Sequence, residues 1–327
     1  MATPLIELER GCVARAGRSL WESIDLVRSG LNAWERRHGR SVRLVGFSTH
    51  YNVSMEHSRR SARALDALAR LLTFVLPAPV MLLALNKRST GVGVRPRLDR
   101  IEVTADFTPS STLMIAAGSV IAGIVREIAT WRSFDPAELP RRGLPVIRGF
   151  TPMPHTSRQG WLARYDCYPL NPIAADVNAG VWGLEGRPPA DRASLRQIAT
   201  ETFNAFRRPI ARTADPLSLR LAHAVLAGRA PSLLDLPDRP PEYDDVGRLC
   251  GWQKFYPDSL LVRSRFERVV INALAREKLH LDGFEYTPTG MQGWSRVVFR
   301  RDADGEHITL PLEDLLEHLQ AWGRQRA

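Results

Sequence analysis

Two short segments combine polar side chains in a way that could bind a phosphorylated ligand. Residues 46–54 read GFSTHYNVS and residues 100–106 read RIEVTAD, so polar and apolar residues alternate in both. Alternate residues of a strand face the same side. His50 and Asn52 would therefore share one face of the first strand, and Glu102 would lie on a polar face of the second. An edge strand facing water gives the same pattern, and spacing alone does not separate the two.

Arginines precede and flank Glu102 in the sequence. Arg95, Arg97 and Arg100 all lie within seven positions of it. Guanidinium groups bind phosphates and carboxylates, and a glutamate can hold a metal ion, so this set could handle a nucleotide. Residues 91–94 (GVGV) could direct backbone N–H groups at a phosphate, although they match neither the P-loop nor the GxGxxG motif. The alternative is a charged surface strand with local ion pairs.

Glu7 and Glu9 are a second source of carboxylates. They are two positions apart in residues 4–9 (PLIELE), which we expect to form a short strand. Both side chains would then face one side and could bind Mg²⁺ through hard oxygen ligands. The alternative is a strand face near the terminus that is exposed to solvent.

The sequence pattern of residues 1–132 predicts the helices and strands that would position these side chains. Apolar residues recur at helical spacing over residues 19–37, and Ser19 and Glu22 would form a capping box at the start of that helix. The remaining expected elements are strands at 42–55 and 100–106, helices at 58–75 and 111–130, an apolar element at 80–86 and a loop at 87–97. Helices would cover a sheet and leave one sheet face open as a site, so we predict an α+β fold.

The rest of the chain differs from residues 1–132 in composition and in the elements that we expect. Residues 133–190 are rich in Pro and Gly and are expected to form a long functional loop region or an interdomain connection, in which His155 is a candidate for a lid over the site. Residues 191–327 are expected to be mainly helical, with a β-hairpin near the end. The expected elements there are helices at 191–208, 216–228, 260–278 and 312–322 and a hairpin of residues 294–301 and 306–311 with an Asp-Gly turn.

The composition and net charge indicate which kinds of partner the protein could bind. The 327 residues carry a net charge of +10, and all but three of the 45 basic residues are arginine. This favours an anionic partner such as a nucleotide or nucleic acid, although a GC-rich genome gives the same bias. The three cysteines lie far apart, and no apolar leader is seen, so we expect a cytoplasmic protein without a disulfide framework. The apolar runs 71–86 and 113–125 are shorter than the roughly 20 residues that a spanning helix needs, so we expect no membrane partner.

The order of these features resembles the glutamate–cysteine ligase type of carboxylate–amine ligase over residues 5–130. A strand ending in Glu is followed by a helix that opens with Ser-Leu-x-Glu, and then by a Gly-x-x-x-His strand at 46–50. An apolar helix broken by prolines, a Val-Arg-Pro loop and an Ile-Glu-Val strand at 101–103 come next. The resemblance implies a glutamine-synthetase-like fold, in which an antiparallel sheet has helices on one face.

The resemblance also implies an activity. Such ligases use ATP and Mg²⁺ to phosphorylate a small-molecule carboxylate, which an amine then attacks to give an amide. The implied roles are metal binding for Glu7, Glu9 and Glu102, nucleotide or metal contacts for His50 and Asn52, and phosphate or carboxylate binding for Arg95, Arg97 and Arg100. The family usually has an Arg where this chain has Thr104. A degenerate homologue that binds an anionic partner, a nucleic-acid-associated protein and a homo-oligomer therefore stay open as alternatives.

Overall fold

The computed structural model describes residues 2–3, 5–55, 61–108, 110–155, 159–237, 263–276, 278–292 and 295–315. Helices and antiparallel sheets alternate along this part of the chain, which confirms the predicted α+β class. The largest sheet has the strand order β1-β3-β2-β5-β4, and its neighbours all pair antiparallel. Its strands are β1 (Ser48–Ser54), β2 (Gly91–Pro96), β3 (Arg100–Asp106), β4 (Met153–Pro154) and β5 (Trp161–Arg164).

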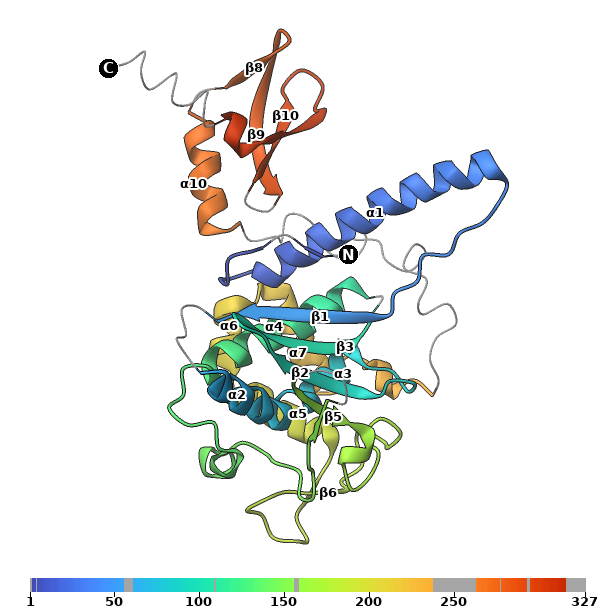
Figure 1. Ribbon diagram of the computed structural model, residues 1–327, viewed down its shortest axis with the longest axis vertical. Coiled ribbons are helices and arrows are strands. Elements are labelled where there is room, and N and C mark those ends of the chain that lie inside the picture. Colours follow the sequence, from blue (N-terminus) through green and yellow to red (C-terminus); the bar gives the residue numbers. More distant parts are fainter. Residues whose placement is uncertain are drawn as a thin grey trace.

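One face of this sheet is packed against helices, because every second strand residue is apolar. Val53, Val94, Ile101 and Val103 are buried against the helical layer. Its helices are α2 (Ala62–Val75), α3 (Pro77–Ala84) and α4 (Ser111–Ile128), and behind them lie α5 (Leu195–Ala205), α6 (Arg207–Thr213) and α7 (Pro216–Leu226) (Figure 1). The helices predicted at 58–75, 111–130, 191–208 and 216–228 and the apolar element predicted at 80–86 correspond to α2, α4, α5, α7 and α3. Residues 58–60 lie outside the described residues.

Helix α4 owes its apolar composition to its position in the core. It is long and apolar enough to cross a membrane, but 83% of its residues are buried inside the protein. It packs against α1, α3, α6 and α7. The bent pair α2–α3, with an angle of 61° between its helices, passes the same test of length and composition.

Helix α1 (Cys12–His38) begins earlier than the sequence predicts. We expected it to start at Ser19 with a capping box to Glu22, and this was wrong: Glu22 pairs with Arg18, and the residue before the helix is Gly11. The first turns of α1 are buried, and Trp21 packs edge-on against the Phe107 ring. Tertiary packing therefore extends the helix beyond its local start signal.

Residues 133–190 contribute to the central sheet, since β4 and β5 complete it. The sheet thus continues past the boundary that we expected at residue 132. Further short elements in this region and beyond are η1 (Pro136–Glu138), η2 (Pro140–Arg142), η3 (Tyr165–Cys167), η4 (Leu233–Asp235) and the pair β6 (Trp182–Gly183) and β7 (Arg192–Ala193).

The C-terminal part forms a second, smaller sheet with its own core. Its elements are α10 (Arg265–Leu274), β8 (Leu279–Leu281), β9 (Phe284–Gln292), β10 (Arg296–Arg301) and β11 (His307–Pro311). The strand order is β11-β10-β9-β8, and a separate cluster around Ile271, Val297 and Phe299 packs beneath it. The β10–β11 pairing confirms the predicted hairpin. Parts of the helices expected at 260–278 and 312–322 lie outside the described residues.

Candidate functional site

The face of the central sheet opposite α2–α4 collects most of the predicted site residues. In the β1–β3 register His50 lies opposite Thr104 and Asn52 lies opposite Glu102. Arg95 lies opposite Glu102 from the other side, on β2. Strand alternation turns all of these side chains away from the core. The predicted residues that the structure brings to this face are His50, Asn52, Arg95, Arg97, Arg100 and Glu102.

Glu102 is the centre of an ion-pair cluster. Glu102 and Arg95 are each only 5% exposed, and the Arg95 guanidinium donates to the Glu102 carboxylate. Arg97 Nη2 donates to Glu102 Oε2 at 3.1 Å, and His50 Nδ1 lies 3.5 Å from Oε1. Burial alone would raise the pKa of Glu102, but the hydrogen bond from Arg97 and the charges of Arg95, Arg97 and His50 outweigh it and lower the pKa. The carboxylate is therefore held in its charged form.

Asn52 and Arg100 lie at the exposed margin of the same face. Arg100 Nε donates to Asn52 Oδ1 at 3.0 Å, and Arg100 Nη1 donates to Asp99 Oδ1 at 2.8 Å. Neither residue lines the large cavity of this face. Their contacts match the charged surface strand that the sequence left open as an alternative.

The glutamates predicted at the N-terminus are not part of this site. Residues 5–9 do not form the expected strand, because the Glu9 N–H donates to the Glu7 carbonyl in a tight turn. The Glu9 carboxylate instead accepts from Arg15 and from the backbone N–H of Arg265. Glu7, Glu9 and Glu102 therefore do not converge on one ion.

The remaining carboxylates of the open face do not form a metal site either. Glu102 and Asp106 are four residues apart on β3, which is about 13 Å along a strand, so they cannot share one ion. The Glu102 carboxylate accepts hydrogen bonds from arginines, and the Asp106 carboxylate accepts one from Ser89 Oγ. Within the described ranges no group of three His, Cys, Asp or Glu side chains is placed to hold a metal. The donor set does not fit Mg²⁺.

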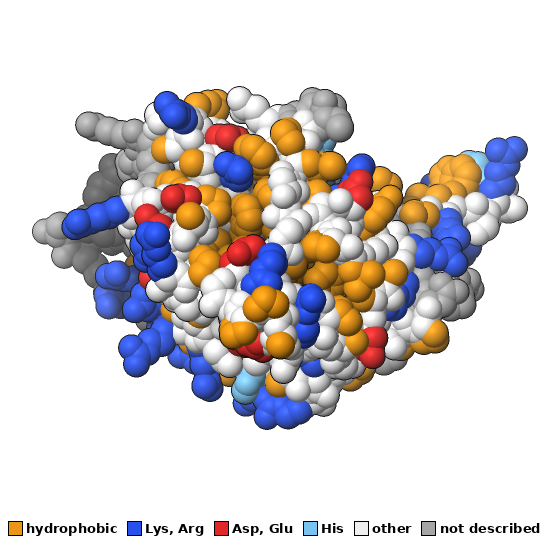
Figure 2. All heavy atoms as spheres, turned by 90° about the horizontal axis from the view of Figure 1, so that it is seen from below, with side chains coloured by type: hydrophobic (Ala, Val, Ile, Leu, Met, Phe, Trp, Pro, Cys, Tyr) orange, Lys and Arg blue, Asp and Glu red, His pale blue; other side chains and the backbone are white. Residues whose placement is uncertain are grey.

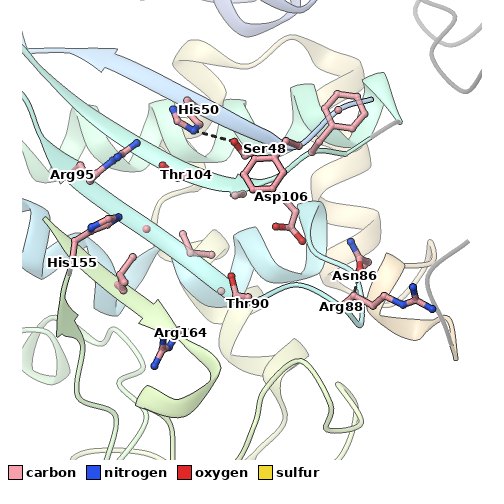
Figure 3. A pocket seen from close by; sticks show the side chains of 18 of the residues that line it. Ser48, His50, Asn86, Arg88, Thr90, Arg95, Thr104, Asp106, His155 and Arg164 are labelled. Carbon is pink, nitrogen blue, oxygen red and sulfur yellow. Dashed lines mark hydrogen bonds between the residues drawn. The ribbon is translucent and has the colours of Figure 1, made fainter. Parts of the chain in front are cut away.

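A cavity of about 860 Å³ lies on this face, towards the Asp106 end of β3. Figure 3 shows His50, Arg95 and His155 at one end, Asn86 and Arg88 at the other, and Thr90, Thr104, Asp106 and Arg164 between them. The charged residues of its lining are three arginines and one aspartate. Two of these arginines already pair with carboxylates outside the lining, Arg95 with Glu102 and Arg164 with Asp166, so their positive charge is largely compensated.

Several of these lining residues were missed by the sequence analysis. Asp106 and Thr104 follow the alternation of Glu102 and could have been included. Arg88 and Thr90 are held by a fixed turn, in which Ser89 Oγ accepts from the Asn86 N–H at 3.0 Å. Sequence spacing gives no signal for such a turn. His155, a candidate lid residue by sequence, does line the cavity.

The cavity floor contains donors that have no acceptor. Arg95 Nε and Thr104 Oγ1 are buried and make no hydrogen bond within the protein. Gly93 lies on the same floor, where an added Cβ would be in tight contact with Leu162 Cδ2 at 3.3 Å and would lie 4.0 Å from Thr104 Oγ1. Buried polar groups are almost always paired, so these two donors could serve a ligand acceptor, which would reach them only after a local movement because both atoms are shielded from solvent.

No family model, curated protein or solved structure matches this chain. The likeness to carboxylate–amine ligases therefore rests on the residues quoted above. The features that bear on function are the cavity and the charged residues around it.

Thr104→Val provides the first test of the cavity floor. We expect the free energy of unfolding to stay the same or rise by up to about 1 kcal/mol, because a methyl group replaces a buried hydroxyl that has no partner. Urea denaturation followed by circular dichroism measures this. A loss of more than about 1 kcal/mol would show that the hydroxyl has a structural partner and would remove it from the site.

Proposed function

We propose that the protein binds an anionic small molecule, bearing phosphate or carboxylate groups, on the open face of its central sheet. The observation that carries this is the lining of the cavity, which holds Arg88, Arg95 and Arg164 and a single aspartate, with Arg95 and Arg164 also paired to Glu102 and Asp166. The unpaired donors at Arg95 and Thr104 support the same conclusion. Cationic groups in a concave, partly dry site attract anions more strongly than the same groups on an open surface.

The size and the walls of the cavity suit a ligand of nucleotide size. A volume of about 860 Å³ lies within the range of small-molecule sites. Phe47 and Phe107 line the cavity, and the Phe47 side chain is 92% exposed, so its ring is open to stacking. ATP, the nucleotide that the ligase resemblance names, matches these features in charge and in having a planar base.

Ligation through an acyl phosphate is supported less well than binding. That reaction uses Mg²⁺, and the described carboxylates of the open face are either engaged by arginine and serine or too far apart to share an ion. The binding alternative needs only the cavity and the arginines of its lining. Among the alternatives that the sequence left open, we therefore favour a ligase-like sheet that serves as an anion-binding module.

Isothermal titration calorimetry tests this proposal. We expect ATP to bind the wild-type protein in the presence of EDTA, and pyrophosphate to bind more weakly. Gly93→Ala places a methyl group on the cavity floor beside Leu162 and should weaken binding about tenfold, the equivalent of about 1.4 kcal/mol of lost contact. Gly30→Ala, on α1 with open space around it, is the matched control and should bind as the wild type does.

Two results would contradict the proposal. One is no detectable binding of ATP or pyrophosphate by the wild-type protein. The other is equal binding by the Gly93→Ala variant and the wild type, which would place the ligand outside the cavity. Binding that depends strictly on Mg²⁺, with amide formation from a carboxylate and an amine, would instead restore the ligase hypothesis.

A further inference from the structure

The outer half of helix α1 extends beyond the body of the protein (Figure 1), and several of its apolar side chains are exposed. At the base of the helix Trp21 and Ile24 are buried in the core. Further along, Leu26 is 76% exposed, and Val27 and Trp34 remain more than one-third exposed. Leu26, Val27 and Trp34 therefore lie outside the face of α1 that Trp21 and Ile24 bury.

These apolar residues occupy one side of the helix. At about 100° per residue, the positions of Leu26, Val27, Gly30, Ala33 and Trp34 fall within an arc of about 120°. Gly30 lies in the middle of this arc and has no side chain, so the arc is flat there. A Cβ added at Gly30 would have no atom within 4 Å. Over residues 26–34 this arc contains no charged side chain, so it forms an apolar strip, and Leu31 lies next to it.

The opposite side of α1 is already covered by the chain itself. Arg28 Nη1 donates to the Val42 carbonyl at 2.9 Å, and Glu35 Oε1 accepts from the Val42 N–H at 2.7 Å. Arg28 and Glu35 also pair with each other. The returning segment after Gly39 is therefore fixed on the side away from the apolar strip, and the strip is left open.

Positive charge is concentrated at the same end of α1. Residues 26–55 contain five arginines and only one acidic residue, a net charge of +4. The acidic residue, Glu35, is paired with Arg28. The other four arginines are exposed, and they are Arg36, Arg37, Arg40 and Arg43. In Figure 2 the projecting tip on the right shows apolar and basic side chains next to each other.

We propose that the outer half of α1 binds the surface of an anionic lipid bilayer and lies in the plane of that surface. Leu26, Val27 and Trp34 would enter below the headgroups, and the arginines at the end of the helix would contact lipid phosphates. A bilayer accounts for both the apolar strip and the positive charge. Nucleic acid would leave the strip uncovered, and a second copy of α1 would bring arginines of like charge together.

This proposal differs from the absence of a membrane partner that we expected from the sequence. That expectation concerned segments that could span a bilayer, whereas α1 would lie on its surface. The proposal is independent of the ligand cavity. It depends on exposed side chains, so the variants that test it should keep the fold intact.

Co-sedimentation of the full-length protein with lipid vesicles provides the test. We expect binding to vesicles that contain about one-third phosphatidylglycerol and little binding to pure phosphatidylcholine. The double variant Arg36→Gln/Arg37→Gln should lower the partition coefficient about 30-fold at low salt, at about fivefold for each arginine. The matched control Arg207→Gln/Arg208→Gln removes two adjacent exposed arginines of α6 and should leave the coefficient unchanged.

A second pair of variants separates the apolar contribution from the charge. Leu26→Asn should weaken vesicle binding several-fold at constant charge, whereas Val269→Asn, at an exposed position of α10, should not. The proposal is overturned if wild-type protein fails to sediment with anionic vesicles or if both arginine pairs have equal effects. It is also overturned if the α1 variants instead abolish a dimer, or binding to poly(dT), while vesicle binding is absent.

Discussion

Replacing Arg196 with methionine is expected to lower the free energy of unfolding by about 3–5 kcal/mol, the largest loss that we anticipate for a single side chain of this protein. Arg196 is only 9% exposed. Methionine keeps an unbranched apolar stem of similar width and removes the guanidinium. The variant therefore isolates the polar role of this residue from its packing.

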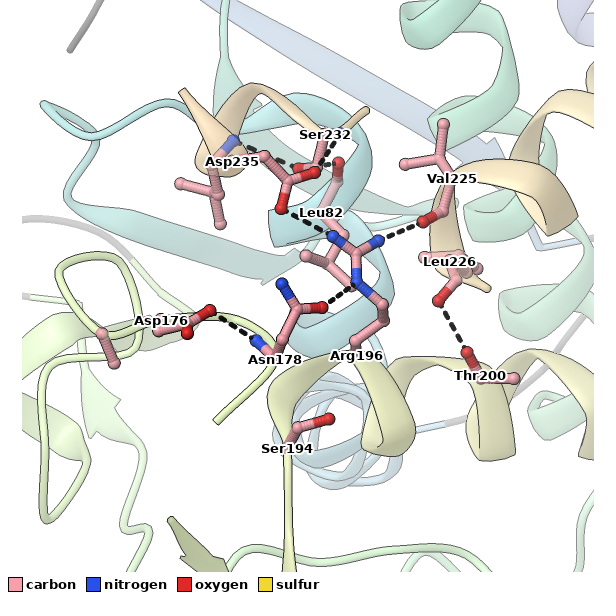
Figure 4. Close-up of polar contacts among 12 residues, drawn as sticks. Leu82, Asp176, Asn178, Ser194, Arg196, Thr200, Val225, Leu226, Ser232 and Asp235 are labelled. Carbon is pink, nitrogen blue, oxygen red and sulfur yellow. Dashed lines mark hydrogen bonds and ion pairs between the residues drawn. The ribbon is translucent and has the colours of Figure 1, made fainter. Parts of the chain in front are cut away.

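The guanidinium of Arg196 joins three segments that are distant in the sequence (Figure 4). Its Nε donates to Asn178 Oδ1 at 2.7 Å, and its Nη2 donates to Asp235 Oδ1 at 2.7 Å. Its Nη1 donates to the carbonyl of Val225 at the end of α7. Without the guanidinium, the Asp235 carboxylate and the Val225 carbonyl would lose a partner in a poorly solvated place, which costs more than the hydrogen bonds themselves contribute.

The loss of stability should extend to α3, because the same cluster of hydrogen bonds holds η4 against that helix. Ser232 Oγ donates to the Leu82 carbonyl, and the Ser232 N–H donates to Asp235 Oδ2. When Asp235 is no longer fixed by Arg196, this turn loses one of its supports. Proteolysis near residue 235 should therefore accelerate in the variant under native conditions.

Urea denaturation monitored by circular dichroism measures the effect of Arg196→Met. Arg192→Met is the matched control, since Arg192 is exposed and bonds only to the Val181 carbonyl at 3.3 Å among the contacts described. It should change stability by no more than about 0.5 kcal/mol. Arg196→Lys should not restore stability, because a single ammonium cannot reproduce the planar fork that reaches three acceptors. Equal losses in Arg196→Met and Arg192→Met would refute this account.

Local patterns predicted β1 and β3 of the site but not β2, because residues 91–96 were expected to lie in a loop and instead form a strand. Alternation in residues 48–54 and 100–106 identifies β1 and β3 and the side chains of each that avoid the core. The Asp-Gly turn identifies the β10–β11 hairpin in the same way. These signals work because side-chain alternation and turn chemistry depend on neighbouring residues only. The contact of His50 with Glu102 depends on the strand register, which no local pattern in the sequence assigns.

The rest of the site depends on contacts that spacing cannot reveal. His155 and Arg164 reach the cavity because β5 pairs with β2, roughly 70 positions away in the chain. Glu9 is drawn out of the expected strand by Arg15 and by the backbone of Arg265. A count of carboxylates and arginines predicts a metal or phosphate site, but it does not show that Glu102 is already neutralised by its neighbours.

Replacing Glu102 with glutamine is expected to lower the free energy of unfolding at neutral pH by about 3 kcal/mol. Glutamine keeps the shape of the side chain and removes the negative charge that Arg95 and Arg97 share. Arg95 would then remain buried with an uncompensated positive charge. Breaking a buried pair by removing one partner costs more than the pair contributes as a whole.

The pH dependence supplies an independent readout of the same interaction. Because the folded pKa of Glu102 is lowered, its stabilising effect is fully present above the unfolded value of about 4.3 and is lost as the pH falls through the folded value. The stability difference between the wild type and Glu102→Gln should therefore be constant near pH 7 and shrink below about pH 4. Glu138→Gln, in an exposed pair with Arg142, is the control and should show a difference within about 0.5 kcal/mol.

Glu102→Gln also separates the two roles that this residue could have. If Glu102 anchors arginines, the variant loses stability without any metal, and Mg²⁺ should raise the melting temperature of neither protein. If Glu102 is a metal ligand, Mg²⁺ should stabilise the wild type selectively, because a ligand that binds only the folded state raises its stability. We expect the first result, since a carboxylate held by Arg95 and Arg97 has little affinity left for a cation. Selective stabilisation by Mg²⁺ would return Glu102 to the metal-binding role and the protein to the ligase hypothesis.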